Sequence, residues 1–199
     1  KGFKHAISSD FIESGTFAIL AAATQSSLRI TGIEQAHLNM TGYYLEKMGV
    51  GITYSDNGKS MTITPGELKS PGRKIQVGLW PGFPTDLMSP MIVLATQAQG
   101  TTLCHDWMFE SRMFFVDKLI SMGADITLCD PHRVLVSGPG ELKSQTLSSP
   151  DIRAGIALVI AALIARGEST IGNAELVDRG YQNIVDRLRQ IGAVIKRTE

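Results

Sequence analysis

The sequence has no excess of charge of either sign, because 19 lysines and arginines balance 19 aspartates and glutamates in 199 residues. A chain without net charge is not attracted as a whole to nucleic acid or to anionic membranes, so indiscriminate binding to either is excluded. The hydrophobic fraction of 43% and the charged fraction of 19% are typical of a globular protein and exclude intrinsic disorder. The length suits one large domain or two small ones.

Cysteine is also scarce. Cys104 and Cys129 are the only two, and neither has another cysteine at ligand spacing. This pattern argues against a disulfide scaffold and against a zinc site. We expect both side chains to be buried, reduced thiols, and we expect no bound metal.

Long hydrophobic runs and a signal peptide are missing as well. The longest apolar run, 156–165, has about half of the ~18 residues that a membrane span needs. Residues 1–5 lead into a polar stretch and do not begin with methionine. The sequence therefore predicts a cytoplasmic protein, or a piece cut from a longer cytoplasmic parent, that does not enter a membrane.

An internal repeat is the most informative feature that is present. The segment Pro-Gly-Glu-Leu-Lys-Ser at 65–70 recurs letter for letter 74 residues later, at 139–144. A Met-Gly pair recurs at the same spacing, at 48–49 and 122–123, and Ile-Gly at 191–192 is a third copy. The repeat predicts three units, roughly 1–70, 71–144 and 145–199.

Each unit has an acidic residue ahead of an apolar stretch that is rich in alanine and glycine. These stretches are 17–24, 91–98 and 154–165, preceded by Asp10, Asp86 and Asp151. They are apolar on nearly every side, so we expect helices that are buried all round. The pair Asp10 and Glu13 predicts a capped helix start, and Pro150 is expected in the first turn of another helix.

Shorter elements follow each buried helix in a fixed order. We expect a strand, then an amphipathic helix that ends at the repeated glycine, then a hairpin. The expected strands are 28–31, 101–104 and 169–171, the helices 113–122 and 181–191, and the hairpins 51–54 with 60–64 and 125–128 with 133–137. The third unit ends after a strand at 193–197 and lacks the hairpin partner, which we expect another segment of the parent to supply.

The predicted fold is therefore α/β, a single inside-out domain of about three β-α-β-α-β-β repeats in which sheets surround buried helices. No long Pro/Gly/Ser linker separates the units, and each unit alone would expose its inner helix.

Residues 79–86, Leu-Trp-Pro-Gly-Phe-Pro-Thr-Asp, form a stiff loop directly before a buried helix. Asp86 at its end has two interpretations. It is either a helix cap alone, or part of a substrate loop in which it accepts a hydroxyl proton or binds a sugar.

Three arginines stand at expected helix starts. Arg153 lies in the first turn of the most apolar helix, where it either pairs with Asp151 or another acid, or binds an anion together with free helix N–H groups. Arg179 follows Asp178, an expected cap, and Arg112 has the matching place in the second unit. A solvated arginine on a capped surface helix is the alternative for Arg179. If the inner helices run in parallel, we expect these arginines to converge.

Four separated motifs resemble those of the bacterial UDP-N-acetylglucosamine enolpyruvyl transferases. They are Phe-Pro-Thr-Asp at 83–86, Met-Phe-Glu-Ser-Arg at 108–112, Asp-Ile-Arg-Ala at 151–154 and Asp-Arg-Gly-Tyr at 178–181, and residues 10–17 are similar too. The resemblance covers essentially all 199 residues, but it corresponds to the C-terminal half of a family member.

The resemblance implies transfer of enolpyruvyl from phosphoenolpyruvate to the sugar 3-hydroxyl, without metal or organic cofactor, as the first committed step of peptidoglycan precursor synthesis. Asp86 would act near the 3-hydroxyl as the base, and Arg153 and Arg179 would bind phosphoenolpyruvate. The nucleotide sugar would be held by Thr85, Asp86, Met108, Phe109 and Arg112, with Asp10 and Asp151 in support.

The sequence departs from the family in ways that limit this implication. Phe11 stands where the family has an arginine. The family's loop with a reactive cysteine and an arginine, and its Lys-Asn pair, belong to the other domain, so we expect the missing N-terminal domain to be a partner and the isolated chain to be nearly inactive. A shikimate-pathway enolpyruvyl transferase and a non-catalytic paralogue that binds a nucleotide sugar are the alternatives.

Overall fold

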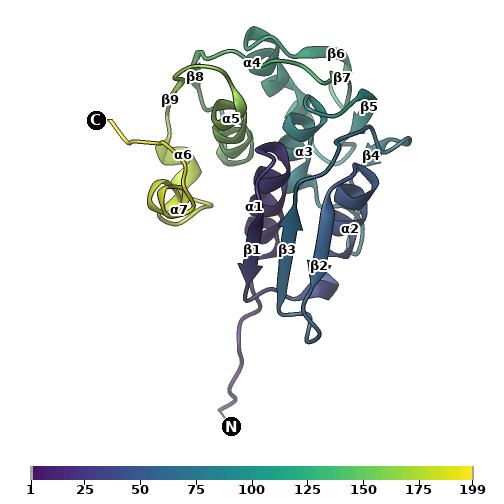
Figure 1. The fold of residues 1–199 in the computed structure, drawn as a ribbon, viewed down its shortest axis with the longest axis vertical. Helices are drawn as coiled ribbons and strands as arrows, with labels where there is room; N and C mark the ends of the chain where they lie inside the picture. The colour runs from purple at the N-terminus through teal and green to yellow at the C-terminus, as the bar shows by residue number, and fades with distance from the viewer. Residues whose placement is uncertain (1, 199) are drawn as a thin grey trace.

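The structure, a computed structural model, describes residues 2–198. Three helices, α1 (Phe11–Ala23), α3 (Met88–Ala95) and α5 (Ile152–Ile164), contact one another at its centre (Figure 1). Their residues are buried on nearly every side, as the alanine-rich stretches predict. The prediction of inner helices is confirmed, although α1 begins several residues before its apolar stretch.

Small sheets lie outside these helices (Figure 1). The first sheet has the strand order β1 (Leu28–Thr31), β3 (Ser60–Thr64), β2 (Gly51–Tyr54), and its central strand pairs antiparallel with both neighbours. The second sheet has the order β4 (Ile75–Gln76), β5 (Gly100–His105), β7 (Arg133–Gly138), β6 (Asp125–Asp130); β4 is parallel to β5, and the other pairs are antiparallel. The third sheet is a parallel pair, β8 (Thr146–Ser148) and β9 (Thr170–Gly172).

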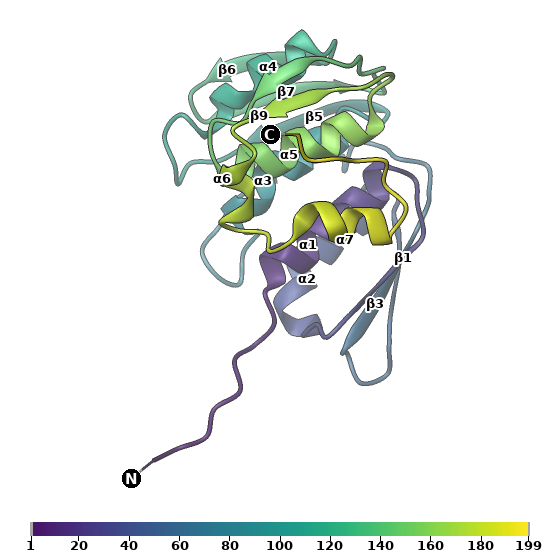
Figure 2. The ribbon, with the colours of Figure 1, turned by 90° about the vertical axis from the view of Figure 1, so that its left-hand side faces the viewer.

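Further helices complete the fold, and α7 faces α1 (Figure 2), to which Arg187 connects it through Glu13. They are α2 (Gln35–Lys47), α4 (Val116–Ser121), α6 (Glu175–Asp178) and α7 (Ile184–Gln190), with the 3-10 turns η1 (Thr85–Leu87) and η2 (Arg112–Phe115). Glycines 49, 123 and 192 follow α2, α4 and α7 with φ of 91°, 99° and 98°. The predicted left-handed glycine after each of these helices is confirmed, because this conformation costs other residues strain.

The two copies of the repeated segment make equivalent hydrogen bonds. Lys69 N donates to Met48 O at 3.0 Å, and Lys143 N donates to Met122 O at 2.8 Å. In each copy this bond ties the segment to the end of the preceding outer helix.

The predicted cap at Asp10 is confirmed, whereas the predicted parts of Glu13 and Pro150 in the helix starts are wrong. Asp10 accepts from the backbone N–H groups of Ile12 and Glu13, at 2.8 and 3.0 Å, and Asp151 caps α5 in the same way. The Glu13 carboxylate does not take part in capping α1, because it pairs with Arg187 of α7. Pro150 precedes the cap and is not in the first turn.

The expected strand at 193–197 is wrong, because no strand is formed between α7 and residue 198. Ala193 and Ile195 are partly buried while Val194 and Lys196 are exposed, which is the alternation of a strand. A strand also needs a neighbour for its hydrogen bonds, and none lies beside this segment in the described part of the chain.

Cys104 is buried in β5, as predicted, whereas Cys129 is exposed in β6. The prediction for Cys129 is wrong because β6 is the edge strand, and its pairing with β7 shifts register between Leu128 and Asp130. Within residues 2–198, no helix is long and apolar enough to cross a membrane.

Candidate active site

The starts of the inner helices meet at one end of the domain. Gly15, in the first turns of α1, packs against Leu87, the residue just before α3. A Cβ atom added at Gly15 would lie only 2.5 Å from Leu87 Cδ1. Arg153, at the start of α5, reaches Asp86 in η1. Residues from η1 and from the first turn of α5 therefore share one site.

Asp86 lies between two arginines. Its Oδ2 atom is 2.8 Å from Nη2 of Arg153, and its Oδ1 atom accepts a hydrogen bond of 3.2 Å from Nη1 of Arg112. All three side chains are between 17% and 29% exposed, so the site is sheltered but open to a ligand. The predicted convergence of arginines occurs for Arg112 and Arg153.

The capping interpretation of Asp86 is wrong. The caps of η1 and α3 are Pro84 and Leu87, and neither helix has a side-chain cap hydrogen bond. Arg153 does form an ion pair, but with Asp86 and not with Asp151, which is occupied as the cap of α5.

The segment after β5 forms the second wall of the site. The guanidinium of Arg112 lies over the ring of Phe109, 4.6 Å from its centroid, and Met108 beside it is partly buried. Ser111 has a left-handed φ of 63°, which turns the chain into η2 and places Arg112 at its start.

Asp106 is a site residue that the sequence analysis missed. It is completely buried, and its carboxylate accepts hydrogen bonds from the Thr85 hydroxyl and from the backbone N–H groups of Met108 and Phe109. The signal available in the sequence is weak: an acidic residue shortly after the expected strand 101–104 and six residues before Arg112.

Arg179 is placed differently from its prediction. Asp178 is the last residue of α6 and not a helix start, and it pairs with Arg197 at 2.6 Å. Arg179 is exposed and forms no ion pair with any residue from 2 to 198. The next residue, Gly180, packs against α5; a side chain there would lie 3.6 Å from Nη1 of Arg153, so the Arg179 segment borders the site.

Tyr181 fixes this segment to the inner helices. Its hydroxyl is completely buried and shares a hydrogen bond of 2.9 Å with the hydroxyl of Thr16 in α1. Burial raises the pKa of the Tyr181 hydroxyl, so this group remains neutral and bonded to Thr16.

Of the two aromatic rings in the loop before η1, one is exposed and one is buried. Trp80 is 60% exposed and lies edge-on to Phe11 and His37, with centroids 5.8 and 5.4 Å away. Phe83 is buried and packs on Tyr44, so it belongs to the core. Phe11, the residue that departs from the family pattern, packs against the Trp80 ring.

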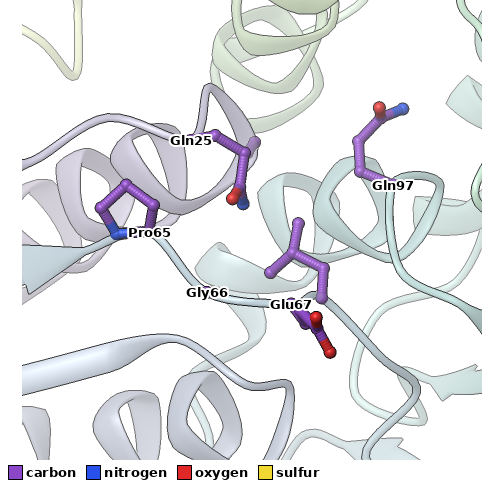
Figure 3. Close-up of a pocket in the computed structure, with 7 residues that line it drawn as sticks. Gln25, Pro65, Gly66, Glu67 and Gln97 are labelled. Carbon is purple, nitrogen blue, oxygen red and sulfur yellow. The ribbon is translucent and has the colours of Figure 1, made fainter.

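Two hollows on the surface are lined by other residues than Asp86. One, of about 510 Å³, lies at the far ends of α1 and α3 and is lined by Ala23, Gln25, Pro65, Gly66, Glu67, Leu68 and Gln97 (Figure 3). The other, of about 640 Å³, is lined by Asp10, Glu13, Gly180, Gln182, Asn183, Asp186, Arg187 and Gln190. Neither hollow has a carboxylate between two arginines among its lining residues, so the Asp86 site is the better candidate for the active site.

The Cys104 thiol does not offer a second reactive group. Burial raises the pKa of the Cys104 thiol to about 12, so this cysteine is unreactive. Within the described residues, no three His, Cys, Asp or Glu side chains are grouped so that they could hold a metal ion.

These features define an inside-out α/β domain with a carboxylate held between two arginines where its inner helices begin. Solved enolpyruvyl transferases have this fold. The enolpyruvyl transferase NikO from Streptomyces tendae has a TM-score of 0.84 at 25% identity, over 96% of this chain and 44% of its own. EPSP synthase from Acinetobacter baumannii has a TM-score of 0.74 at 21% identity, over 98% and 46%. The expected fold class is thus confirmed.

The chain belongs to the EPSP synthase (3-phosphoshikimate 1-carboxyvinyltransferase) family, whose model matches residues 1–188. Among curated relatives, a protein of Treponema denticola is 48% identical over all of this chain and 48% of its own length. A protein of Treponema pallidum is 45% identical over 98% and 47%. Both are named UDP-N-acetylglucosamine 1-carboxyvinyltransferase, so the resemblance seen in the motifs is confirmed, and this chain spans about half the length of these relatives.

Proposed function

We propose that this chain is one domain of an enolpyruvyl transferase that moves enolpyruvyl from phosphoenolpyruvate to the 3-hydroxyl of UDP-N-acetylglucosamine and releases phosphate. The observation that carries the proposal is the placement of Asp86 between Arg112 and Arg153. The names of the relatives at 45–48% identity support the choice of acceptor. The reaction would be the cytoplasmic first committed step of peptidoglycan precursor synthesis, on which cell wall, cell shape and division depend.

In this proposal Asp86 accepts the proton of the 3-hydroxyl as its oxygen attacks C2 of phosphoenolpyruvate and C3 takes up a proton. The tetrahedral adduct then loses a proton from C3 and expels phosphate, which restores the double bond. One arginine holds each carboxylate oxygen of Asp86, so the base is oriented before the substrate arrives.

Arg153 and Arg179 bind phosphoenolpyruvate in this proposal. The substrate has a phosphate and a carboxylate, which favours at least two cations, and each charge-assisted hydrogen bond contributes about 1.5–3 kcal/mol. Arg153 contacts Asp86 through one terminal nitrogen, and its guanidinium has further N–H donors with which to bind the anion. Arg179 is exposed and borders Arg153 through Gly180.

Thr85, Met108, Phe109 and Arg112 hold the nucleotide sugar. Phe109 is 47% exposed, and its ring is stiffened by the Arg112 guanidinium, so it offers a flat apolar surface beside Asp86. Asp10 and Asp151 support the site indirectly, because they cap α1 and α5 and thereby fix the helix starts.

The rest of the longer parent would complete the site. We propose that residues 1–199 form a single domain of three repeats, and that a second domain covers the Asp86 face and supplies the family's loop cysteine, loop arginine and Lys-Asn pair. The purified 199-residue chain should fold but release no phosphate from phosphoenolpyruvate; detectable transfer would contradict this part of the proposal.

The competing function is enolpyruvyl transfer to a shikimate phosphate, which the description of the matching family favours. The test is phosphate release by the full-length protein with phosphoenolpyruvate and either UDP-N-acetylglucosamine or 3-phosphoshikimate. Turnover only with the nucleotide sugar is expected. Turnover only with the shikimate would reverse the assignment, and binding of the nucleotide sugar without turnover would indicate a non-catalytic paralogue.

A further inference from the structure

Asp106 is a completely buried carboxylate that joins two separate loops of the site. One oxygen, Oδ1, accepts from the backbone N–H groups of Met108 and Phe109 at 3.0 and 3.3 Å. This turn fixes the backbone of two residues that face the proposed nucleotide sugar.

The other oxygen, Oδ2, reaches across to the loop before α3. It accepts a hydrogen bond from the Thr85 hydroxyl and lies 3.9 Å from Nε of Arg112. Because Thr85 is the donor, its hydroxyl proton is occupied, and its free lone pairs are left to accept a hydrogen bond from a ligand.

The backbone of Asp106 is held as firmly as its side chain. Its N–H group donates to His132 O at 2.9 Å, and its carbonyl oxygen lies 2.8 Å from Nδ1 of His132. These bonds attach Asp106 to the turn between β6 and β7, so the carboxylate has a fixed position from which to hold Thr85 and Arg112.

We propose, on the basis of the function proposed above, that Asp106 is the positioning residue that assembles the nucleotide-sugar wall of the site. It contacts Thr85, Met108, Phe109 and Arg112, and neither Arg153 nor Arg179 is bonded to it. It also sets the direction of the Thr85 hydroxyl, so the ligand group at Thr85 is a hydrogen-bond donor such as a sugar hydroxyl or an amide. Loss of this carboxylate should therefore weaken use of the nucleotide sugar and spare phosphoenolpyruvate.

The test is the Asp106→Asn variant of the full-length protein, with KM for each substrate and kcat measured separately. We expect KM for UDP-N-acetylglucosamine to rise about tenfold, as for loss of one charge-assisted hydrogen bond, and KM for phosphoenolpyruvate to change less than about twofold. Asp117→Asn is the control, because the exposed Asp117 carboxylate accepts from Lys118 at 3.2 Å and bonds to no proposed substrate residue. The control should leave both constants unchanged.

A double-mutant cycle with Thr85→Val separates positioning from general damage to the fold. If Asp106 acts through Thr85, the effect of Asp106→Asn on KM for the nucleotide sugar should be much smaller in the Thr85→Val background. Additive effects, or a parallel rise of both KM values with a loss of thermal stability, would overturn the proposal.

If Asp106→Asn does not fold, Thr85→Val and Thr85→Ser decide the question. Thr85→Val should raise KM for the nucleotide sugar alone, and Thr85→Ser, which keeps the donor, should restore it; an unchanged KM in Thr85→Val would overturn the proposal. A wild-type protein without transfer to UDP-N-acetylglucosamine would count against the proposed function itself. An active wild type with an unaltered Asp106→Asn variant would count only against the role of Asp106.

Discussion

Asp86 and Arg153 are joined by an ion pair of 2.8 Å that connects the start of α3 to the start of α5. The two partners are 67 positions apart in the sequence, and Arg112, from the start of η2, reaches the same carboxylate. The pair therefore has two consequences, one for the chemistry at Asp86 and one for the binding of anions at Arg153.

The Asp86→Asn variant of the full-length protein should lose the base and keep the fold. We expect kcat to fall by about 10²- to 10⁴-fold, the usual contribution of a general base. The amide can still accept from one arginine, and the site is partly open to water, so the free energy of unfolding should change little. Steady-state kinetics and urea unfolding measure the two effects. A loss of stability with unchanged kcat would instead make Asp86 a structural ion-pair partner.

Arg153→Ala and Arg179→Ala should each weaken binding of phosphoenolpyruvate by about 2–4 kcal/mol, because each removes a charged donor to the anion. Arg153→Ala should lower the free energy of unfolding more than Arg179→Ala. Arg153 is paired with Asp86, whereas Arg179 is exposed and unpaired within residues 2–198. Calorimetric titration and thermal unfolding provide the measurements.

Arg166→Ala is the matched control for these arginines. Arg166 follows the opposite end of α5 and pairs with Glu141 at 3.0 Å on an exposed surface. It should leave phosphoenolpyruvate binding unchanged. Equal losses of binding in all three variants would show that net charge, and not placement at the helix starts, governs affinity.

The three repeated glycines should respond to alanine in a defined order. Their φ angles are similar, but an added Cβ would lie 2.2 Å from Glu67 O at Gly49, 3.4 Å from Glu141 O at Gly123, and near no atom within 4 Å at Gly192. Left-handed strain of about 1 kcal/mol or more is common to all, and only Gly49 adds a severe backbone clash. Urea unfolding should rank the losses Gly49→Ala, then Gly123→Ala, then Gly192→Ala. Equal losses in the free energy of unfolding would mean that the contact between these glycines and the repeated segment does not contribute to stability.

Much of this fold can be predicted from the sequence because its signals are local. Stretches such as 154–165 are apolar on every side, and only a helix enclosed by other elements can use such a pattern. The hairpin strands at 51–54 and 60–64 occur within the predicted limits, since the alternation and the turn between them lie within a few residues.

The parts that could not be predicted depend on which segments meet in space. Asp106 has no spacing signature, and its importance comes from the approach of Thr85, which is 21 residues away in the sequence. The start of α7 was misplaced because Asn183, in a left-handed conformation, precedes it, while Asp178 ends α6 and pairs with Arg197. Likewise, Cys129 is exposed only because β6 is an edge strand with a shifted register.

The two cysteines should differ sharply in reactivity and in their effect on alkaline stability. A thiol reagent at neutral pH should label exposed Cys129 in the folded protein, and Cys104 only after denaturation. The folded pKa of Cys104, about 12, lies above its ordinary value of 9.0, so the thiolate favours the unfolded state. The Cys104 contribution to stability is therefore complete below pH 9.0 and is lost as the pH rises toward 12. Thermal unfolding across this range should show a shallower decline in Cys104→Ala than in Cys129→Ala, the matched control; equal slopes would mean that ionisation of Cys104 is not linked to unfolding.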